Sequence, residues 1–282
     1  MSNSSISLVE DFRRFFSVDV ASRPEQVADV FGIRYRVYCD EFGYESKEEF
    51  PDQQEHDEFD HRSLHCLITH KSSGLPAGCT RLVLCKPGEL LPVEKFCRSA
   101  LDDNSAGVLE QNRAIACEVS RLAVDGRFRR RAGEGDTRFG RVESLDFTAR
   151  EVRTFSLIAV AAYLSACALT ALTDRTLVYA MMEPFLPRLL RRSGILFEPA
   201  GEEINYHGLR APYMARTRDV VTAMHPDLKE LYDAIHDEFS TELDLESLMP
   251  FARACAAPPV DAATSSWIER FSPALWPVVS HA

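Results

Sequence analysis

The sequence predicts a mixed α/β fold in which a central sheet is covered by helices. Short apolar runs of strand length, at residues 62–70, 77–84 and 176–182, alternate with segments of helical spacing such as 24–42. Turn-forming residues separate these segments. The 282 residues, with an apolar share of 45%, are enough to build a full hydrophobic core.

The first half of the chain supplies one helix and three strands. In residues 24–42 the apolar residues recur at helical spacing. Residues 62–70 have strand character, the turn sequence at 72–76 follows, and 77–84 returns as the next strand. Residues 114–124 form a further strand that ends near an Asp-Gly pair. In chain order, these elements predict a helix, then a hairpin, then a third strand.

The second half begins with an Arg-rich loop or short helical segment and continues as alternating helices and strands. In chain order we expect this loop at 126–153, a helix at 154–173, a strand at 176–182, a helix at 184–193 closed by Gly194, a hairpin at 195–213 and helical sequence at 219–251. We divide the chain into a main domain, 1–218, and a C-terminal helical extension and tail, 219–282.

The segment 154–173 has no charged residue over 20 positions, which is long enough to cross a bilayer. It contains six alanines and five Ser or Thr residues, against four leucines and one isoleucine. A strand-like run follows it closely. This composition favours a helix packed on the sheet over a membrane span.

Composition and charge exclude several classes of function. The 43 acidic and 32 basic residues give a net charge of −11, whereas general nucleic-acid binding requires a basic surface. The eight cysteines include no Cys-x-x-Cys pair, so we interpret them as reduced, mostly buried thiols. Residues 1–8 lack the pattern of a signal peptide. We expect a cytoplasmic protein.

Histidines 56, 61, 65 and 70, with Cys66 among them, invite a metal-site interpretation. Their spacing matches no closed tetrahedral pattern, and the run crosses from a loop into a strand. We therefore expect no metal site.

Charged and aromatic residues follow a fixed order in the first part of the chain. The segments are Ile33-Arg34-Tyr35-Arg36-Val37-Tyr38, Glu41-Phe42-Gly43-Tyr44-Glu45, Glu55-His56-Asp57-Glu58-Phe59-Asp60, Gly78-Cys79-Thr80-Arg81-Leu82 and Cys117-Glu118-Val119-Ser120-Arg121-Leu122. In this order they resemble the acyl-homoserine-lactone synthases, a branch of the GNAT-type N-acyltransferases. The resemblance implies a GNAT-like, mostly antiparallel sheet and a reaction in which an amine attacks a fatty acyl thioester.

Three later segments resemble another branch more closely. They are Met181-Met182-Glu183-Pro184-Phe185-Leu186, Leu189-Leu190-Arg191-Arg192-Ser193-Gly194-Ile195 and Tyr206-His207-Gly208-Leu209-Arg210-Ala211-Pro212-Tyr213. They look like the exosortase-associated (PEP-CTERM-associated) acyltransferases, which are related to long-chain N-acyl amino acid synthases. This resemblance covers roughly residues 30–216. It implies transfer of a long acyl chain from acyl carrier protein to the α-amine of an amino acid.

Glu118, Ser120 and Arg121 are the candidates for catalysis. The α-amino group, with a reference pKa of about 8, must lose a proton before it attacks, and a carboxylate can take that proton. Glu118 sits in an apolar strand, where desolvation would raise its pKa. On a regular strand Glu118 and Arg121 would face opposite sides, whereas a β-bulge would bring them to one face. The alternatives are a structural ion pair or an exposed edge strand.

The resemblance assigns further residues to a charged pocket for the amine substrate. They are Arg34, Tyr38, Tyr44, Asp57, Asp60, Arg81, Phe96, His207 and Arg210. A guanidinium can hold a carboxylate through two hydrogen bonds, so this set can also bridge the N-terminal segment to the sheet. Tyr38 and Tyr44 stand where the lactone synthases usually carry Phe and Trp, which weakens the case for S-adenosylmethionine. For His207 and Arg210 the alternative to carboxylate binding is a simple hairpin turn.

Arg127, Arg129, Arg130 and Arg131 form a local basic patch on an acidic protein. Such a patch suits an acidic acyl carrier protein, although a solvated loop explains it equally well. The sequence 130–135 also fits the Arg-x-x-Gly-x-Gly pattern of GNAT enzymes. However, about eighteen residues separate it from the next helix, so the phosphate-binding interpretation is weak.

The leading hypothesis is an acyl-carrier-protein-dependent N-acyltransferase that makes N-acyl amino acids and needs no cofactor beyond its acyl donor, acyl carrier protein or coenzyme A. The alternatives are an acyl-homoserine-lactone synthase that uses S-adenosylmethionine, a catalytically silent acyl-binding module, and an acetyl-coenzyme A enzyme.

Overall fold

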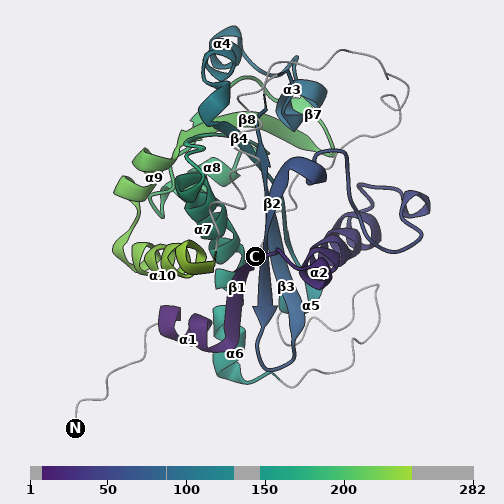
Figure 1. Ribbon diagram of the computed structural model, residues 1–282, viewed down its shortest axis with the longest axis vertical. Coiled ribbons are helices and arrows are strands. Elements are labelled where there is room, and N and C mark those ends of the chain that lie inside the picture. The colour runs from purple at the N-terminus through teal and green to yellow at the C-terminus, as the bar shows by residue number, and fades with distance from the viewer. Residues whose placement is uncertain (1–7, 87, 130–146, 243–282) are drawn as a thin grey trace.

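The computed structural model describes residues 8–86, 88–129 and 147–242 (Figure 1). Its strands are β1 (Phe16–Val20), β2 (Ser63–His70), β3 (Leu75–Leu84), β4 (Ala116–Val124), β5 (Leu177–Met182), β6 (Glu198–Pro199), β7 (Ile204–Asn205) and β8 (Leu209–Arg216). They form one sheet in the order β1-β2-β3-β4-β5-β8-β6, with β7 paired to β8. Of these pairs, β4–β5 is parallel and the others are antiparallel. The predicted mixed, mostly antiparallel α/β fold is confirmed.

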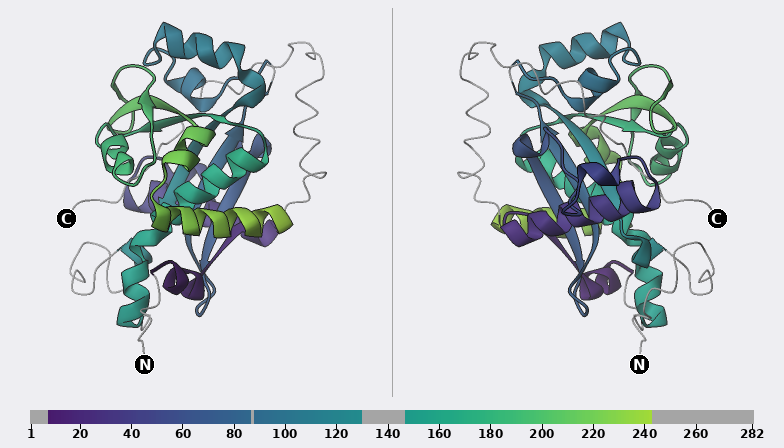
Figure 2. Two further views of the ribbon diagram at one scale, coloured as in Figure 1. Left: turned by 90° about the vertical axis from the view of Figure 1, so that its left-hand side faces the viewer. Right: turned by 90° about the vertical axis from the view of Figure 1, so that its right-hand side faces the viewer.

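Helices cover both faces of this sheet. They are α1 (Leu8–Phe15), α2 (Pro24–Arg34), α3 (Pro92–Phe96), α4 (Asp103–Gln111), α5 (Gly126–Arg129), α6 (Ala149–Thr154), α7 (Ser156–Leu172), α8 (Leu186–Arg191), α9 (Thr217–Ala223) and α10 (Pro226–Glu242). Figure 2 shows α7 and α10 in front of the sheet from one side and α2 in front of it from the other. Helices α3 and α4 lie beyond one end of the strands (Figure 1).

The uncharged helix α7 packs on the sheet and supplies much of the main core. The approach is close: a Cβ at Gly78 of β3 would lie 2.8 Å from Ile158 Cγ2. The absence of a side chain at Gly78 permits this contact with Ile158. In the described part of the chain, no helix is both long enough and apolar enough to cross a membrane. The prediction of a buried helix is confirmed.

Most strand predictions agree with the structure to within one or two residues, and the helix at 154–173 agrees equally well. The leading helix is less regular than expected, because its second half, Tyr35–Glu41, is a π-helical turn. The hairpin expected at 195–213 is one long strand, β8, with two very short partners. Helices α1, α3 and α4 and strand β1 were not predicted.

The described part of the helical sequence expected at 219–251 forms two helices, because the helix is interrupted just before Pro226. Residues 243–251 lie outside the described residues. Helix α10 packs its apolar side chains against α7 and β1 within the main core. The division of the chain at residue 218 stays a prediction. Among the described residues seven cysteines are free thiols, and six of these are buried, as expected.

Candidate active site

Strand β4 carries a β-bulge at Arg121. Cys79 of β3 pairs with Ala123, but Arg81 pairs with Ser120, so two residues of β4 oppose one residue of β3. Arg121 adopts the left-handed conformation, with φ 52°. On the α7 side of the sheet, Val119, Leu122 and Val124 belong to the core.

The bulge therefore brings Glu118, Ser120 and Arg121 to the opposite face together. The strand predicted at 114–124 is present, with the β-bulge that brings Glu118 and Arg121 to one face. The alternative of an exposed edge strand is wrong, since all nine residues of β4 are buried. The alternative of a structural ion pair stays open, because Arg121 pairs with Glu55.

Above this face three buried arginines meet three carboxylates. Arg34 donates to both oxygens of Asp60, at 2.7 and 3.1 Å, and also to Glu55. Arg81 Nη1 donates to Asp57 at 2.6 Å and to Asp60 at 2.9 Å, while Arg81 Nε donates to Ser120 Oγ at 3.1 Å. Asp60 thus joins α2 to β3. The predicted convergence of Arg34, Asp57, Asp60 and Arg81 is present.

Arg121 completes this charge cluster from the bulge. Its Nη2 lies 3.0 Å from Glu55 Oε1, 3.2 Å from Asp57 Oδ2 and 3.4 Å from Glu45 Oε1. Burial alone would raise the pKa of Glu55, but Arg121 and Arg34 lower it to about 2. Sequence reasoning missed Glu45 and Glu55 as members of the cluster. The signal was present, because both lie in the quoted acidic segments.

Tyr38 packs against the Arg121 end of the charge cluster. Its hydroxyl donates to the carbonyl of Leu122 at 3.0 Å, and the Arg121 guanidinium lies 5.4 Å from the centre of its ring. Tyr38 is fully buried in the core between α2 and the sheet. It holds the bulge and Arg121 in place, and it lines neither of the two pockets described below.

Glu118 faces a narrow pocket. Its Oε2 accepts a hydrogen bond from the backbone N–H of Val93, at 2.7 Å, at the start of α3. Its Oε1 is buried and has no hydrogen-bond partner among the described residues. Burial raises the pKa of Glu118 to about 8. The pocket is lined by Arg81, Pro92, Val93, Phe96, Cys97, Glu118, Ser120, Arg121, Met181 and Tyr206.

Within the described residues, Arg81 also has a buried polar atom without a hydrogen-bond partner beside this pocket. Its Nη2 atom is buried and has no hydrogen-bond partner in the part of the chain that the structure describes. The pocket lining thus combines one unpaired carboxyl oxygen, on Glu118, with one unpaired guanidinium nitrogen, on Arg81. A buried polar group without a partner is costly, so both atoms are suited to a polar ligand.

Phe96 and Arg121 separate this pocket from a neighbouring one and line both. The neighbouring pocket is acidic and aromatic; it is lined by Glu45, Glu49, Phe50, Glu55, His56, Asp57, Glu58, Phe59, Phe96 and Arg121. Phe96 also packs edge-on against Phe59, with ring centres 5.9 Å apart. The structure therefore places Phe96 at the pocket wall, as predicted.

The turn between β7 and β8 closes the site from the other side. Tyr206 lines the Glu118 pocket, and His207 packs against Tyr44 with ring centres 5.5 Å apart. Burial, together with the charges of Arg121 and Arg210, lowers the pKa of His207. Arg210 is buried and pairs with Glu183. Tyr44, His207 and Arg210 thus lie around the site, although none of them lines the Glu118 pocket itself.

The basic patch is only partly described. Arg127 is paired with Asp125 at 2.8 and 2.9 Å, and Arg129 pairs with Glu41 and donates to the Val124 carbonyl at 2.7 Å. These two arginines are therefore largely neutralised within the fold. Arg130 and Arg131 lie outside the described residues.

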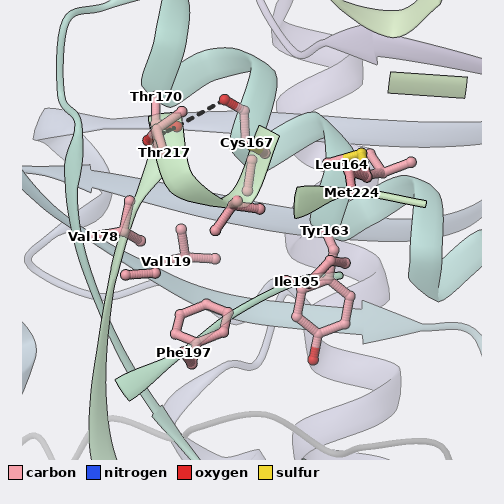
Figure 3. A pocket seen from close by; sticks show the side chains of 13 residues that line it. Val119, Tyr163, Leu164, Cys167, Thr170, Val178, Ile195, Phe197, Thr217 and Met224 are labelled. Atoms are coloured by element: carbon pink, nitrogen blue, oxygen red, sulfur yellow. Dashed lines mark hydrogen bonds between the residues drawn. The ribbon is translucent and has the colours of Figure 1, made fainter. Parts of the chain in front are cut away.

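A third pocket, which is apolar, lies on the opposite face of the sheet, between α7, α9 and strands β4, β5 and β8 (Figure 3). Val119, Tyr163, Val178, Phe197 and Met224 are among its lining residues. Its polar groups include the hydroxyls of Thr170 and Thr217, which are hydrogen-bonded to each other at 2.8 Å. Glu118 and Val119 are consecutive, so the Glu118 pocket and this apolar pocket lie on either side of β4.

The pairing of β4 and β5 ends at Glu118 and Tyr179. Beyond this point the register of the two described strands shows no further β4–β5 pair.

The histidine run does not converge on one point. His65 lies 3.6 Å from Asp60 and edge-on to Phe31, whereas His70 contacts Glu151 and Ser73. Within the described ranges, no group of three or more His, Cys, Asp or Glu residues could hold a metal ion.

Comparison with known proteins agrees with this architecture. Residues 33–135 match the family model described as an acetyltransferase (GNAT) domain. No curated protein matches the chain in sequence.

Among solved structures, FeeM, an N-acyl amino acid synthase from uncultured soil microbes, is 11% identical with TM-score 0.50, covering 76% of this chain and 97% of its own. TofI, in a complex with an inhibitor and MTA, is 22% identical with TM-score 0.49, covering 77% of this chain and 99% of its own. The AHL synthase LasI is 15% identical with TM-score 0.47, covering 74% and 96%. The likeness to FeeM shows a shared fold, and with the domain match it supports the conclusion that the chain is an acyltransferase with a GNAT-like fold.

Proposed function

We propose that the protein is an N-acyltransferase that moves a long-chain acyl group from an acyl carrier protein thioester to the α-amine of an amino acid. One observation carries the proposal: Glu118 Oε1 and Arg81 Nη2 are both buried and unpaired at the same pocket. An α-amino acid carries the complementary pair of groups, an amine for Glu118 and a carboxylate for Arg81. The geometry therefore suits a zwitterion better than a simple amine.

Glu118 is suited to act as the general base. Its pKa of about 8 is close to the reference value of about 8 for an α-amino group, so a proton can pass between them at little cost. Ionised Glu118 takes one proton from the α-ammonium group. The neutral nitrogen forms a bond to the thioester carbonyl carbon, the C–S bond breaks, and the departing sulfur takes the second proton from the nitrogen. Glu118 then loses its proton to water.

Ser120 and Arg121 have supporting roles in this scheme. Ser120 Oγ accepts from Arg81 Nε and so fixes the direction of the Arg81 guanidinium. Arg121 stands between the two pockets and is held by Glu55. We assign Arg34, Asp57 and Asp60 to positioning Arg81 and the N-terminal segment, since their contacts are with one another.

The apolar pocket of Figure 3 is the proposed acyl site. The acyl chain would cross the sheet beyond the last β4–β5 pair, which places its carbonyl beside Glu118 and its methylenes against Val119. Each buried methylene contributes about 0.8 kcal/mol. A long chain therefore binds more tightly than an acetyl group.

The finer assignments rest on the sequence resemblance. These are acyl carrier protein as donor rather than coenzyme A, action in the cytoplasm, and an association with exosortase systems. Arg127 and Arg129 give the carrier assignment little support because they are paired internally, which leaves Arg130 and Arg131 as the candidate contacts. We propose that the donor is a substrate and that no bound cofactor takes part.

The test is mass spectrometry of the products formed by the purified protein with acyl carrier protein or coenzyme A thioesters and a panel of amino acids. The panel also contains S-adenosylmethionine. An N-acyl amino acid that Glu118→Gln fails to make supports the proposal. An acyl-homoserine lactone would identify an S-adenosylmethionine enzyme instead, and acyl binding without any turnover would identify a binding module.

Arg81→Lys is the matched variant for the amino acid carboxylate. Lysine keeps the positive charge but has no forked guanidinium, so it loses the Nη2 donor. We expect the KM for the amino acid to rise while the KM for the acyl donor stays near that of the unmodified protein.

A further inference from the structure

The segment from Phe185 to Leu196, which contains α8, exposes three large apolar side chains. Phe185 is 38% exposed, Leu189 is 49% exposed and Leu196 is 37% exposed. Only six large hydrophobic residues in the described chain are exposed to this degree, and half of them lie in this segment. Phe185 and Leu189 are four residues apart and therefore lie on the same side of α8. A cluster of this kind marks an interaction surface.

The same segment carries three exposed arginines, Arg188, Arg191 and Arg192. No acidic side chain in the described part of the chain forms an ion pair with any of them. Elsewhere, Arg127 and Arg129 show how this acidic protein pairs its arginines internally. Against a net charge of −11, the α8 segment is therefore a local basic and apolar surface.

The C-terminal end of this segment, at Leu196, lies next to the apolar pocket. Ile195 and Phe197 are buried and line that pocket, whereas Leu196 between them faces outward. Figure 3 shows the side chains of Ile195 and Phe197 at the pocket. A single layer of polypeptide therefore separates the proposed acyl site from the exposed segment.

We propose that the α8 surface, made of Phe185, Arg188, Leu189, Arg191, Arg192 and Leu196, docks on an anionic lipid bilayer. Arginines attract the negatively charged headgroups, and Phe and Leu side chains enter the boundary between headgroups and acyl chains. The arginines alone would be enough to attract an acidic protein partner. The exposed Phe and Leu side chains favour a bilayer instead, because it offers them an apolar environment. This places the acyl pocket at the membrane surface.

The consequence for the reaction rests on the proposed function. A long-chain N-acyl amino acid is an amphiphile with one carboxylate, and it partitions into bilayers. Release from a pocket held against the membrane would deliver this product without passage through water.

The test is co-sedimentation of the purified protein with vesicles of phosphatidylcholine alone or of phosphatidylcholine mixed with phosphatidylglycerol. We expect binding to the mixed vesicles that weakens with salt. Arg188→Gln with Arg191→Gln should lower the partition coefficient roughly 25-fold, about fivefold for each charge. Leu189→Gln should weaken binding in a salt-independent way.

Two control variants lie away from this surface. Leu90 has the same 49% exposure as Leu189, and Arg98 is another exposed arginine. Leu90→Gln and Arg98→Gln should bind vesicles as the unmodified protein does. Equal binding by the α8 variants and these controls, or no binding by any of them, overturns the proposal.

A different partner would show itself in the kinetics. If the α8 variants bind vesicles normally but raise the KM for an acyl carrier protein donor, the surface serves that acidic protein and the lipid proposal is wrong. Vesicle binding needs no substrate, so Glu118→Gln should bind as the unmodified protein does. The docking result therefore stands or fails independently of the proposed reaction.

Discussion

Glu55 accepts hydrogen bonds from both Nε and Nη2 of Arg121, at 3.2 and 3.0 Å to the same carboxylate oxygen. Its other oxygen accepts from Arg34. One buried carboxylate thus neutralises part of two guanidinium groups, one on the leading helix and one on the bulged strand. The N-terminal segment and β4 are held together by this residue.

Glu55→Gln tests that role. The substitution keeps the shape but leaves two buried arginines short of one negative charge, and breaking a buried ion pair costs about 3 to 5 kcal/mol. We expect a fall of this order in the free energy of unfolding, measured by urea denaturation. Glu25→Gln, which breaks the exposed pair with Arg23, should change the same free energy by less than about 1 kcal/mol. Equal changes in the free energy of unfolding for the two substitutions would show that Glu55 does not stabilise the fold through Arg34 and Arg121.

The rate of acyl transfer should depend on the ionisation of Glu118. We expect kcat/KM to rise with pH and to level off above about pH 8, because the ionised carboxylate is the base. Glu118→Gln should lower turnover by about two decades or more, and its remaining pH dependence should report the substrate amine alone. A variant that keeps the full rate at every pH would show that Glu118 is not the base.

The same carboxyl group should make stability depend on pH. Burial raises the pKa of Glu118 to about 8 in the folded protein, whereas in the unfolded chain the group has its ordinary pKa of 4.5. Between these values the folded state binds one more proton, so this group's contribution to stability falls as pH rises, by at most about 1.4 kcal/mol per pH unit.

Glu118→Gln removes this dependence. The variant should therefore gain stability over the unmodified protein as the pH is raised from 5 toward 8, as measured by thermal or urea unfolding at several pH values. A stability difference that stays constant with pH would mean that Glu118 is ionised in the folded protein throughout.

The apolar pocket should control acyl chain length. Ala166 lines this pocket on α7, and Ala166→Leu would fill part of it. We expect the products to shift toward shorter acyl chains, by about one to three methylenes, since each lost methylene of burial costs about 0.8 kcal/mol. Ala171→Leu lies on the same helix but outside the pocket lining, and its product distribution should match that of the unmodified protein. The measurement is mass spectrometry with a mixture of acyl donors.

Much of the fold could be predicted because local sequence carries its signals. The strands at β2, β3, β4 and β5 are apolar runs that are bounded by turns or charged residues, and α7 is too rich in small residues to be a membrane span. Strand β1 and helices α1, α3 and α4 are short and polar in part, and their stability comes from contacts with the rest of the fold. The same reason explains the two short partners of β8, each of only two residues.

The sequence by itself determined the residue types of the site, the order in which they occur and the apolar character of the strand that carries Glu118. Only the tertiary structure decided which buried polar atoms of the site lack a hydrogen-bond partner among the described residues. The bulge at Arg121, the pairing of Arg210 with Glu183 and the unpaired atoms of Glu118 and Arg81 all depend on partners far away in the chain. Whether a buried polar atom is satisfied depends on distances between segments, and no local pattern records those distances.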